Sequence, residues 1–253
     1  MRVEPEQVLA GGNVAASVVR VGATVRKPAN AATPAVHALL DHLHAASFSG
    51  APRALGRDAS GRQVLEYVPG DCADQLPPMD AAQLRRVGAL IRRLHDAIAT
   101  FSSPAGARWD VVIRPDREEL ICHNDLAPWN LVCDGDRMVF IDWDGAGPGS
   151  RLWDLGYAAH GFVPLWPGGD PAVDAPRLRA LVDGYGASEA QRLALPELIE
   201  AHTRGMYELL CASAATGAQP WARLHASGHG DHWGPAAAYI GAHLEHWRAA
   251  LLD

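Results

Sequence analysis

The order of hydrophobic and polar positions predicts that the first part of the chain is built mainly of strands. Two runs of β-branched residues, 16–21 and 23–27, meet at Gly22 and predict a hairpin. A third run, residues 63–68, predicts a further strand. Between them, apolar residues at helical spacing predict a helix over about 33–46, with Thr33 as its N-cap and a proline in its first turn. This part is expected to be a small sheet with one inserted helix.

Helical patterns dominate after the segment Pro69-Gly70-Asp71, which breaks the strand and is typical of a hinge. Apolar residues at helical spacing predict a helix over residues 80–98, and Asp134-Gly135 between two apolar runs predicts a hairpin. In the second of the later helices, the regular part is expected to begin at Pro196. Those later helices are predicted over residues 175–185, 188–216 and 235–252.

The pattern therefore predicts an α+β protein with two lobes, a small β-rich lobe over residues 1–70 and a larger helical lobe over residues 71–253. A chain of 253 residues, 48% hydrophobic and 20% charged, is long and apolar enough to bury a real core in such lobes. The formal net charge of −7 argues against nucleic acid as a partner.

Negative charge is concentrated in the second lobe. Through Asp71 the chain has seven basic and six acidic residues, and after Asp71 it has 15 basic and 23 acidic ones. An acidic lobe suits a cationic substrate, although a solvated acidic surface is the commoner explanation for such a composition.

Nothing in the sequence predicts export or insertion into a membrane. The four cysteines have no CxxC spacing, which favours free thiols in a reducing compartment. No apolar signal segment opens the chain, and no stretch approaches the length of a membrane span. The expected location is the cytoplasm, with no membrane partner.

The most specific chemical signal lies in residues 121–142. His123, Asp125 and Asn130 lie on a predicted loop, and Asp142 follows the apolar run of the hairpin. Phosphoryl transfer from a nucleotide requires a carboxylate that orients and deprotonates the attacking hydroxyl, and an Asn and an Asp that hold magnesium against the phosphates. Asp125 is therefore the predicted catalytic base, and Asn130 and Asp142 are the predicted metal ligands. An Asp and an Asn on a loop more often form turns, but this spacing favours catalysis.

With these residues the sequence resembles the aminoglycoside phosphotransferase and choline kinase relatives of the eukaryotic-type protein kinases. The resemblance continues in residues 151–156, where Asp154 is similar to the family's buried Asp that braces the catalytic loop. It implies a bilobal protein-kinase-like fold and Mg²⁺-dependent transfer of phosphate from ATP or GTP to a small-molecule hydroxyl. It also implies a structural role for His123, through hydrogen bonds within the loop.

Lys27 is the only lysine in the chain, since every other basic side chain among the 22 is an arginine. It lies near the end of a predicted strand, where the resemblance implies the phosphate-binding lysine. A chance surface lysine is the alternative, and Arg26 takes the role if the strand register shifts by one. The resemblance also implies that the hinge strand offers backbone groups to the adenine, so Glu66 and Val68 join Lys27 as predicted cofactor-binding positions.

Two parts of this nucleotide site are incomplete in the sequence. The glycine-rich loop consists only of residues 10–13, Ala-Gly-Gly-Asn, without a GxGxxG pattern. The inserted helix contains no Glu that could pair with Lys27, so Asp41 or His37 is expected to substitute.

The resemblance implies that the acceptor pocket is built from the late helices. The acidic candidates for substrate contacts are Asp144, Glu208 and Asp231, with a turn role or a second-metal role for Asp144 as the alternatives. The chain also has twelve histidines, and three of them have a spacing that suits zinc only on a helix: His225, His229 and His232. The glycines around these three predict a loop, which argues against a metal there.

The function expected from the sequence is a magnesium- and nucleotide-dependent O-phosphotransferase that acts on a small, possibly cationic molecule with a hydroxyl group. The resemblance and the acidic second lobe favour an aminoglycoside-like or other amine-rich antibiotic as the acceptor. One alternative is a metabolic kinase for an amino alcohol, a sugar or a choline-like compound. The other is a nucleotide-binding regulatory pseudokinase, which the short glycine loop favours and the intact Asp125, Asn130 and Asp142 oppose.

Overall fold

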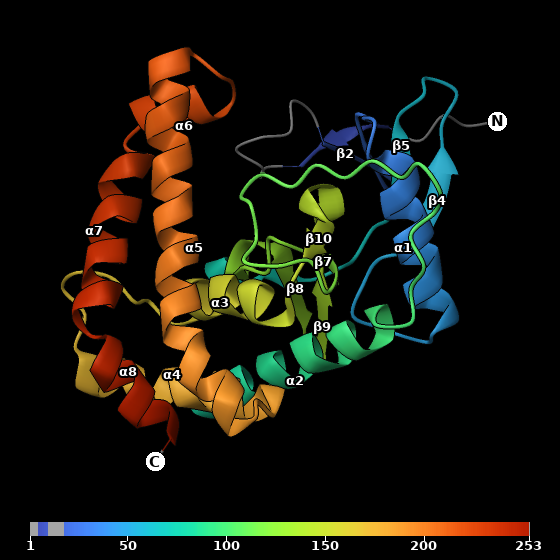
Figure 1. The fold of residues 1–253 in the computed structure, drawn as a ribbon. Helices are drawn as coiled ribbons and strands as arrows, with labels where there is room; N and C mark the ends of the chain where they lie inside the picture. The colour runs from blue at the N-terminus through green and yellow to red at the C-terminus, as the bar shows by residue number, and fades with distance from the viewer. Residues whose placement is uncertain (1–4, 10–17, 253) are drawn as a thin grey trace.

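The computed structural model describes residues 5–9 and 18–252, and it has the expected α+β architecture (Figure 1). The first lobe contains an antiparallel sheet with the strand order β1-β2-β3-β5-β4. The β2–β3 pair confirms the predicted hairpin, whereas β4 was not predicted. The strands of this sheet are β1 (Gln7–Val8), β2 (Val19–Val21), β3 (Thr24–Lys27), β4 (Ala54–Arg57) and β5 (Gln63–Glu66).

Helix α1 (Thr33–Ala45) follows β3 and begins where the sequence predicts, but with a different cap. Thr33 is the first helical residue and not the N-cap. The side chain of Asn30 accepts hydrogen bonds from the backbone N–H groups of Ala32 and Thr33, each at 3.0 Å. An asparagine just before the helix thus satisfies its first N–H groups, because asparagine oxygens are good acceptors at this position.

The second lobe combines short strands with seven helices among the described residues, and its helices α4–α8 lie on the side opposite the first sheet (Figure 1). A three-stranded sheet contains β6 (Asp71–Cys72), β8 (Leu131–Asp134) and β9 (Arg137–Phe140), and a separate pair contains β7 (Leu120–Cys122) and β10 (Gly147–Gly149). The β8–β9 pair confirms the second predicted hairpin. The lobe boundary at residue 70 stays a prediction.

The helices of the second lobe are α2 (Ala81–Ile98), α3 (Arg151–Phe162), α4 (Pro171–Tyr185), α5 (Glu189–Thr216), α6 (Trp221–Ala226), α7 (His229–Ala242) and α8 (Leu244–Leu252). None of the described helices combines the length and the apolar composition that crossing a membrane requires.

Two expectations about the late helices are wrong. Helix α5 is regular from Glu189 and passes through Pro196, because a capping box of Ser188 and Gln191 starts it about two turns before the proline. The helix predicted over residues 235–252 is two helices, α7 and α8, separated at His243.

The glycine-rich segment before residue 235 belongs to α7 and is not the loop that the sequence predicts. A Cβ added at Gly234 would lie only 2.9 Å from the ring of Tyr207 on α5. The glycine therefore serves close packing of α7 against an aromatic side chain, rather than a turn.

Helix α3 was not predicted as a helix, and its burial explains why. Nearly all of its residues are buried, including Asp154 and His160, so it lacks the polar face that makes an amphipathic pattern visible in a sequence. Its start is well defined, because Ser150 accepts a hydrogen bond from the Trp153 N–H at 3.1 Å. It lies beside the predicted catalytic loop.

Helices α2 and α4 approach each other through glycines. A Cβ added at Gly88 on α2 would overlap the carbonyl oxygen of Leu181, and one added at Gly184 on α4 would overlap the carbonyl oxygen of Arg85. These are backbone atoms that cannot turn away as a side chain can. The contact matters for the site because α2 also carries the buried His95, described below.

We expect Gly88→Ala to lower the free energy of unfolding by about 1–3 kcal/mol or more, because the added methyl group forces α2 away from α4. Gly241→Ala on α7 is the matched control, since its Cβ would meet Glu200 Cγ at an ordinary 3.6 Å. The free energy of unfolding of that variant is expected to equal that of the wild type or to exceed it by up to about 1 kcal/mol, because alanine has the higher helix propensity. Urea unfolding measures both, and equal stability of the two variants would contradict the close α2–α4 contact.

Candidate functional site

Asp125 and Asn130 lie on the short loop between β7 and β8, which ends in a 3-10 turn, Pro128–Asn130. The amide nitrogen of Asn130 donates to Asp125 Oδ2 at 2.7 Å and to the Asp125 backbone oxygen at 3.0 Å. Burial raises the pKa of Asp125 to about 6, although hydrogen bonds from Tyr157 and Asn130 lower it. The carboxylate is therefore mostly ionised at neutral pH and more basic than an ordinary aspartate, as proton acceptance requires.

His123 connects this loop to the segment that carries Asp142. Its Nδ1 accepts a hydrogen bond from the Asp125 N–H at 3.2 Å, and its Nε2 lies 3.1 Å from the carbonyl oxygen of Ile141. An imidazole that accepts at one nitrogen and donates at the other is neutral, and burial lowers the pKa of His123 accordingly. The ring also lies 4.5 Å from that of Trp143. These contacts leave both ring nitrogens engaged within the protein.

Asp154 on α3 has a fully buried carboxylate that contacts the backbone of the predicted catalytic loop. Its two oxygens accept hydrogen bonds from the backbone N–H groups of His123 at 3.2 Å and Asn124 at 2.8 Å. His95 Nε2 lies 3.1 Å from the same carboxylate, and His95 Nδ1 lies 3.0 Å from the Tyr185 hydroxyl. Burial alone would raise the pKa of Asp154, but the hydrogen bond with His95 and those from the loop hold it below its ordinary value.

Lys27 reaches from β3 to two carboxylates of the second lobe. Its Nζ lies 2.7 Å from Asp142 Oδ1 and 2.9 Å from Asp144 Oδ2. Burial would lower the pKa of Lys27, but the two carboxylates outweigh it and raise the pKa above the ordinary value. For Asp142, burial would raise the pKa, but the Lys27 ammonium lowers it below its ordinary value. The lysine is thus charged and joins β3 to the segment after β9.

The sequence predicts that Asp142 ends a strand, and this is wrong. Asp142 lies two residues after β9, in a left-handed backbone conformation with φ of 60°. A 3-10 turn, Trp143–Gly145, follows at once, so Asp144 lies in a turn. Both acids nevertheless contact the same lysine, because the turn brings their side chains to one place.

The helix partner expected for Lys27 is absent. The described ion pairs of Lys27 go to Asp142 and Asp144, and neither Asp41 nor His37 is among them. Burial lowers the pKa of His37, whose neutral ring lies near Gln63. The missing helix Glu is therefore not replaced from within α1.

Tyr157 on α3 is a site residue that no sequence signal identified. It hydrogen-bonds to Asp125, and burial together with that carboxylate raises its pKa well above the ordinary value. Its ring stacks on His202 with centroids 4.6 Å apart and lies nearly parallel to Trp233 at 6.3 Å. These rings fix the direction of the hydroxyl. The pattern could not reveal this, because α3 has no polar face from which to single out one side chain.

The remaining predicted positions lie apart from this cluster. Glu66 accepts a hydrogen bond from the Arg53 N–H at 3.2 Å, and Val68 packs against Val132 and Val139. Glu208 on α5 and Asp231 on α7 are exposed. Within residues 5–9 and 18–252, no hydrogen bond or ion pair joins these four residues to Asp125, and the short glycine loop, residues 10–13, lies outside the described residues.

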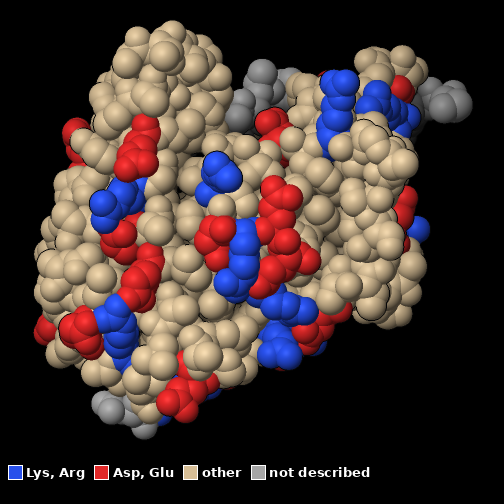
Figure 2. All heavy atoms as spheres, in the orientation of Figure 1, with Lys and Arg blue, Asp and Glu red and all other residues tan. Residues whose placement is uncertain are grey.

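The second lobe is not uniformly acidic on the face seen in Figure 2, where red and blue side chains alternate over α5 and the centre of the molecule. Ion pairs account for much of this mixture, for example Arg92 with Asp96 and Arg204 with Glu200. The excess of acidic residues in the sequence is therefore partly neutralised by neighbouring arginines.

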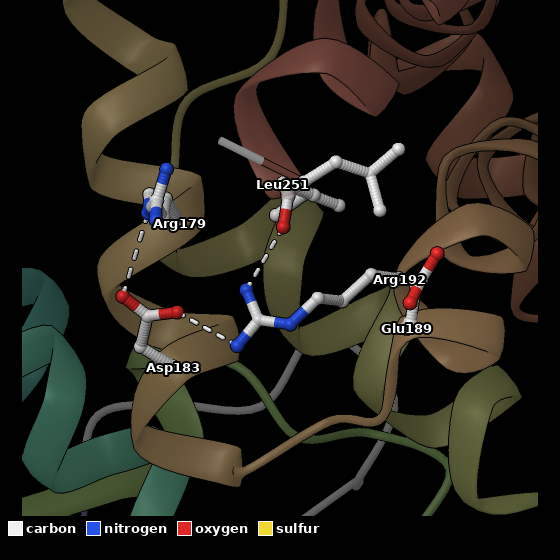
Figure 3. A pocket seen from close by; sticks show the side chains of 6 residues that line it. Arg179, Asp183, Glu189, Arg192 and Leu251 are labelled. Carbon is white, nitrogen blue, oxygen red and sulfur yellow. Dashed lines mark hydrogen bonds and ion pairs between the residues drawn. The ribbon is translucent and has the colours of Figure 1, made fainter.

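Two depressions of the described surface have neither Lys27 nor Asp125 in their lining. One lies where α4, α5 and α8 meet, and Figure 3 shows Asp183 between Arg179 and Arg192. Asp183 is 3.7 Å from Arg179 and 2.7 Å from Arg192, which also donates to the Leu251 carbonyl. Because these charges are satisfied by one another, this depression belongs to helix packing.

The donors near Lys27 fit a magnesium ion. Asp142 and Asp144 offer carboxylate oxygens, and their side chains are 39% and 38% exposed. Asn130 carries a carboxamide oxygen on the loop of Asp125, and its side-chain nitrogen donates to Asp125. Hard oxygen ligands of this kind suit Mg²⁺, which normally completes its shell with water and phosphate oxygens. Among the described residues, no group of three or more His, Cys, Asp or Glu side chains could hold a metal by itself. His225, His229 and His232 do not come together as such a group among the described residues.

The sequence of the chain is similar to those of known proteins. Residues 105–198 match the family described as "Phosphotransferase enzyme family". The trifolitoxin immunity protein of Rhizobium leguminosarum bv. trifolii is 32% identical over 201 residues, which cover 74% of this chain and 77% of that protein.

Two solved structures share the fold over nearly the whole chain. A choline/ethanolamine kinase family protein from Mesorhizobium loti superposes with a TM-score of 0.63 and 19% identity, covering 98% of this chain and 92% of that one. An amicoumacin kinase in complex with AMP-PNP, Ca²⁺ and Ami has a TM-score of 0.67 and 14% identity, with 97% and 87% covered. The kinase-like bilobal fold predicted from the sequence is thereby confirmed.

We expect Asp154→Asn to lower the free energy of unfolding at neutral pH by at least about 1–3 kcal/mol, because an amide leaves a buried loop N–H facing another donor. Asp96→Asn is the control, since it alters two ion pairs at the surface, with Arg92 and Arg151, each worth no more than about 1 kcal/mol.

The wild type and Asp154→Asn together also test the charge of Asp154. A carboxylate with a lowered pKa stabilises the fold above its unfolded-state pKa and loses that contribution as the pH falls through the folded value. The difference in stability between wild type and Asp154→Asn should therefore shrink on acidification, measured by urea unfolding across pH. A difference that stays constant with pH would contradict an ionised, hydrogen-bonded Asp154.

Proposed function

The chain belongs to the phosphotransferase enzyme family, and we propose that it is a magnesium- and nucleotide-dependent O-phosphotransferase acting on a hydroxyl group of a small molecule. The observation that carries this proposal is the position of His123. One neutral imidazole contacts the loop of Asp125 on one side and the segment of Asp142 on the other. The groups that a proton acceptor and a metal site require are thereby held at a fixed separation.

In the proposed reaction Asp125 orients the acceptor hydroxyl and accepts its proton during in-line attack on the terminal phosphate. Its elevated pKa supports this role, because a stronger base takes the proton more readily while remaining ionised near neutral pH. Lys27 contacts the phosphates with a compact ammonium group. Asn130 and Asp142 would hold Mg²⁺, which supplies charge neutralisation at the phosphate oxygens.

The acceptor is proposed to be a toxic or antibiotic compound that carries a hydroxyl group. The relative that is 32% identical is named as an immunity protein against trifolitoxin, and one structure of the same fold is named as a kinase of amicoumacin. A metabolic acceptor such as an amino alcohol is the second candidate, favoured by the likeness to a choline/ethanolamine kinase family protein. ATP and GTP are both candidate donors.

The direct test incubates the purified protein with Mg²⁺, radiolabelled ATP or GTP and a panel of aminoglycosides, peptide antibiotics and amino alcohols. We expect one acceptor class to be labelled, and Asp125→Asn to lower the turnover at least about a hundredfold, because a general base contributes that much or more. Asp134→Asn, an exposed change on the neighbouring hairpin, serves as the control and should turn over normally.

Nucleotide binding in the same samples separates enzyme from binding module. Asp125→Asn should still bind nucleotide, with a thermal shift that requires Mg²⁺. If no acceptor is labelled and the thermal shift of the wild type ignores Mg²⁺, a regulatory nucleotide-binding module replaces the enzyme.

The pH profile of the reaction provides a second test. Asp125 with a pKa of about 6 becomes protonated as the pH falls, so kcat/KM should decline below about pH 6. Tyr157→Phe removes a hydrogen bond that lowers this pKa, so the acidic limb should move to higher pH while the ring stacking is retained. Tyr239→Phe, whose hydroxyl has no described partner, is the control and should leave the limb in place. An unchanged limb in Tyr157→Phe would contradict the contact with Asp125.

A further inference from the structure

Lys27 lies between two carboxylates, although the expected chemistry requires only one of them for the metal. Its Nζ is 2.7 Å from Asp142 and 2.9 Å from Asp144, and the residue is 5% exposed. We propose that Asp144 is the positioning residue that holds Lys27 when Asp142 is engaged by the metal, in place of the helix carboxylate that α1 lacks. This inference rests on the proposed function, which assigns the metal to Asp142 and the phosphates to Lys27.

Helix α1 has no side chain that could take this role. It contains no Glu, and its one Asp, Asp41, is exposed and forms no described ion pair with Lys27. His37 lies near Gln63 and Asp144. An imidazole is either neutral or positively charged, so it cannot balance an ammonium charge. The leucines of α1 are fully buried in the core, which fixes the helix as a structural element.

A second carboxylate is needed on physical grounds. A buried ammonium group without a counter-charge is costly, because the protein then does not replace the water that it has lost. When Asp142 turns its oxygens to a metal, Asp144 is the remaining described carboxylate within ion-pair distance of Lys27. The lysine can then stay charged and oriented.

Asp144 is itself held in place from the first lobe. The side-chain amide of Gln63 on β5 donates to Asp144 Oδ1 at 3.2 Å and to the Pro28 carbonyl oxygen at 3.1 Å. Gln63 is almost fully buried. One oxygen of Asp144 therefore faces Gln63 and the other faces Lys27, as expected of a side chain that fixes another side chain in position.

The single lysine of the chain makes a direct test possible, because amine acylation at Lys27 can be followed by peptide mass spectrometry without interference from other lysines. Removing a carboxylate lowers the pKa of the lysine, so the fraction of reactive neutral amine rises. The comparison uses three proteins without nucleotide or metal: Asp142→Asn, which mimics the loss of Asp142 to a metal, Asp142→Asn with Asp144→Asn, and Asp142→Asn with Asp134→Asn as the control.

If Asp144 holds Lys27, the variant with both Asp142→Asn and Asp144→Asn should be acylated about tenfold faster or more than Asp142→Asn alone, because an adjacent opposite charge shifts a pKa by one unit or more. The Asp134→Asn control should match Asp142→Asn. Equal rates in all three folded proteins would overturn the proposal. Circular dichroism checks folding, and this readout is independent of phosphoryl transfer, so its outcome is separate from that of the proposed function.

A second measurement uses the otherwise intact protein and distinguishes a lysine partner from a metal ligand. In Asp144→Asn the affinity for AMP-PNP should fall about tenfold with Mg²⁺ present and much less without it, because Asp142 still holds Lys27 when no metal competes. The Mg²⁺ concentration that half-saturates the thermal shift should stay at the wild-type value. A raised Mg²⁺ requirement, as expected for Asp142→Asn, would make Asp144 a metal ligand and overturn the proposal.

Discussion

The site depends on a buried carboxylate that fixes the backbone of a loop. Asp154 has no exposure to solvent, yet it carries charge and accepts two hydrogen bonds from the loop and one from His95. The site needs such support because Asn124 on this loop and Asp142 after β9 both have left-handed backbone conformations, with φ of 62° and 60°. Each such residue costs of order 1–3 kcal/mol unless the surroundings determine it. Asp154 and His123 supply those surroundings.

The same network links the two lobes. His123 connects the loop of Asp125 to the segment of Asp142, and Lys27 on β3 binds that segment from the other side. Any displacement of β3 relative to the second lobe therefore changes the counter-charge around Asp142 directly. In the proposed enzyme, the lysine that binds phosphate and the aspartate that binds the metal are therefore neighbours across the two lobes, and α1 is left as a core helix.

The sequence predicted those parts of the fold that have a visible period or a turn signal. Both hairpins and α2 were found because their apolar positions repeat at two or at about three and a half residues, whereas α3 was missed because it is buried on all sides. In the candidate site, spacing singled out the loop of Asp125 and Asn130, and composition singled out Lys27. Partners that come from distant elements, such as Tyr157, His95 and Gln63, carry no local signal, since only the tertiary fold brings them to the loop.

The surroundings of Asp125 also show why a charge count over a lobe does not describe an acceptor site. The second lobe has an excess of acidic residues, but the described side chains that hydrogen-bond to the Asp125 carboxylate are a carboxamide and a phenol, Asn130 and Tyr157. Next to them lie the rings of Trp129, which is 44% exposed, and Trp233. Charges more than about 10 Å away are largely screened at the surface. In the proposed enzyme, recognition beside Asp125 would therefore depend on aromatic surface and hydrogen bonds, and a preference for a cationic acceptor would come from Asp125 and from the faces of the tryptophan rings.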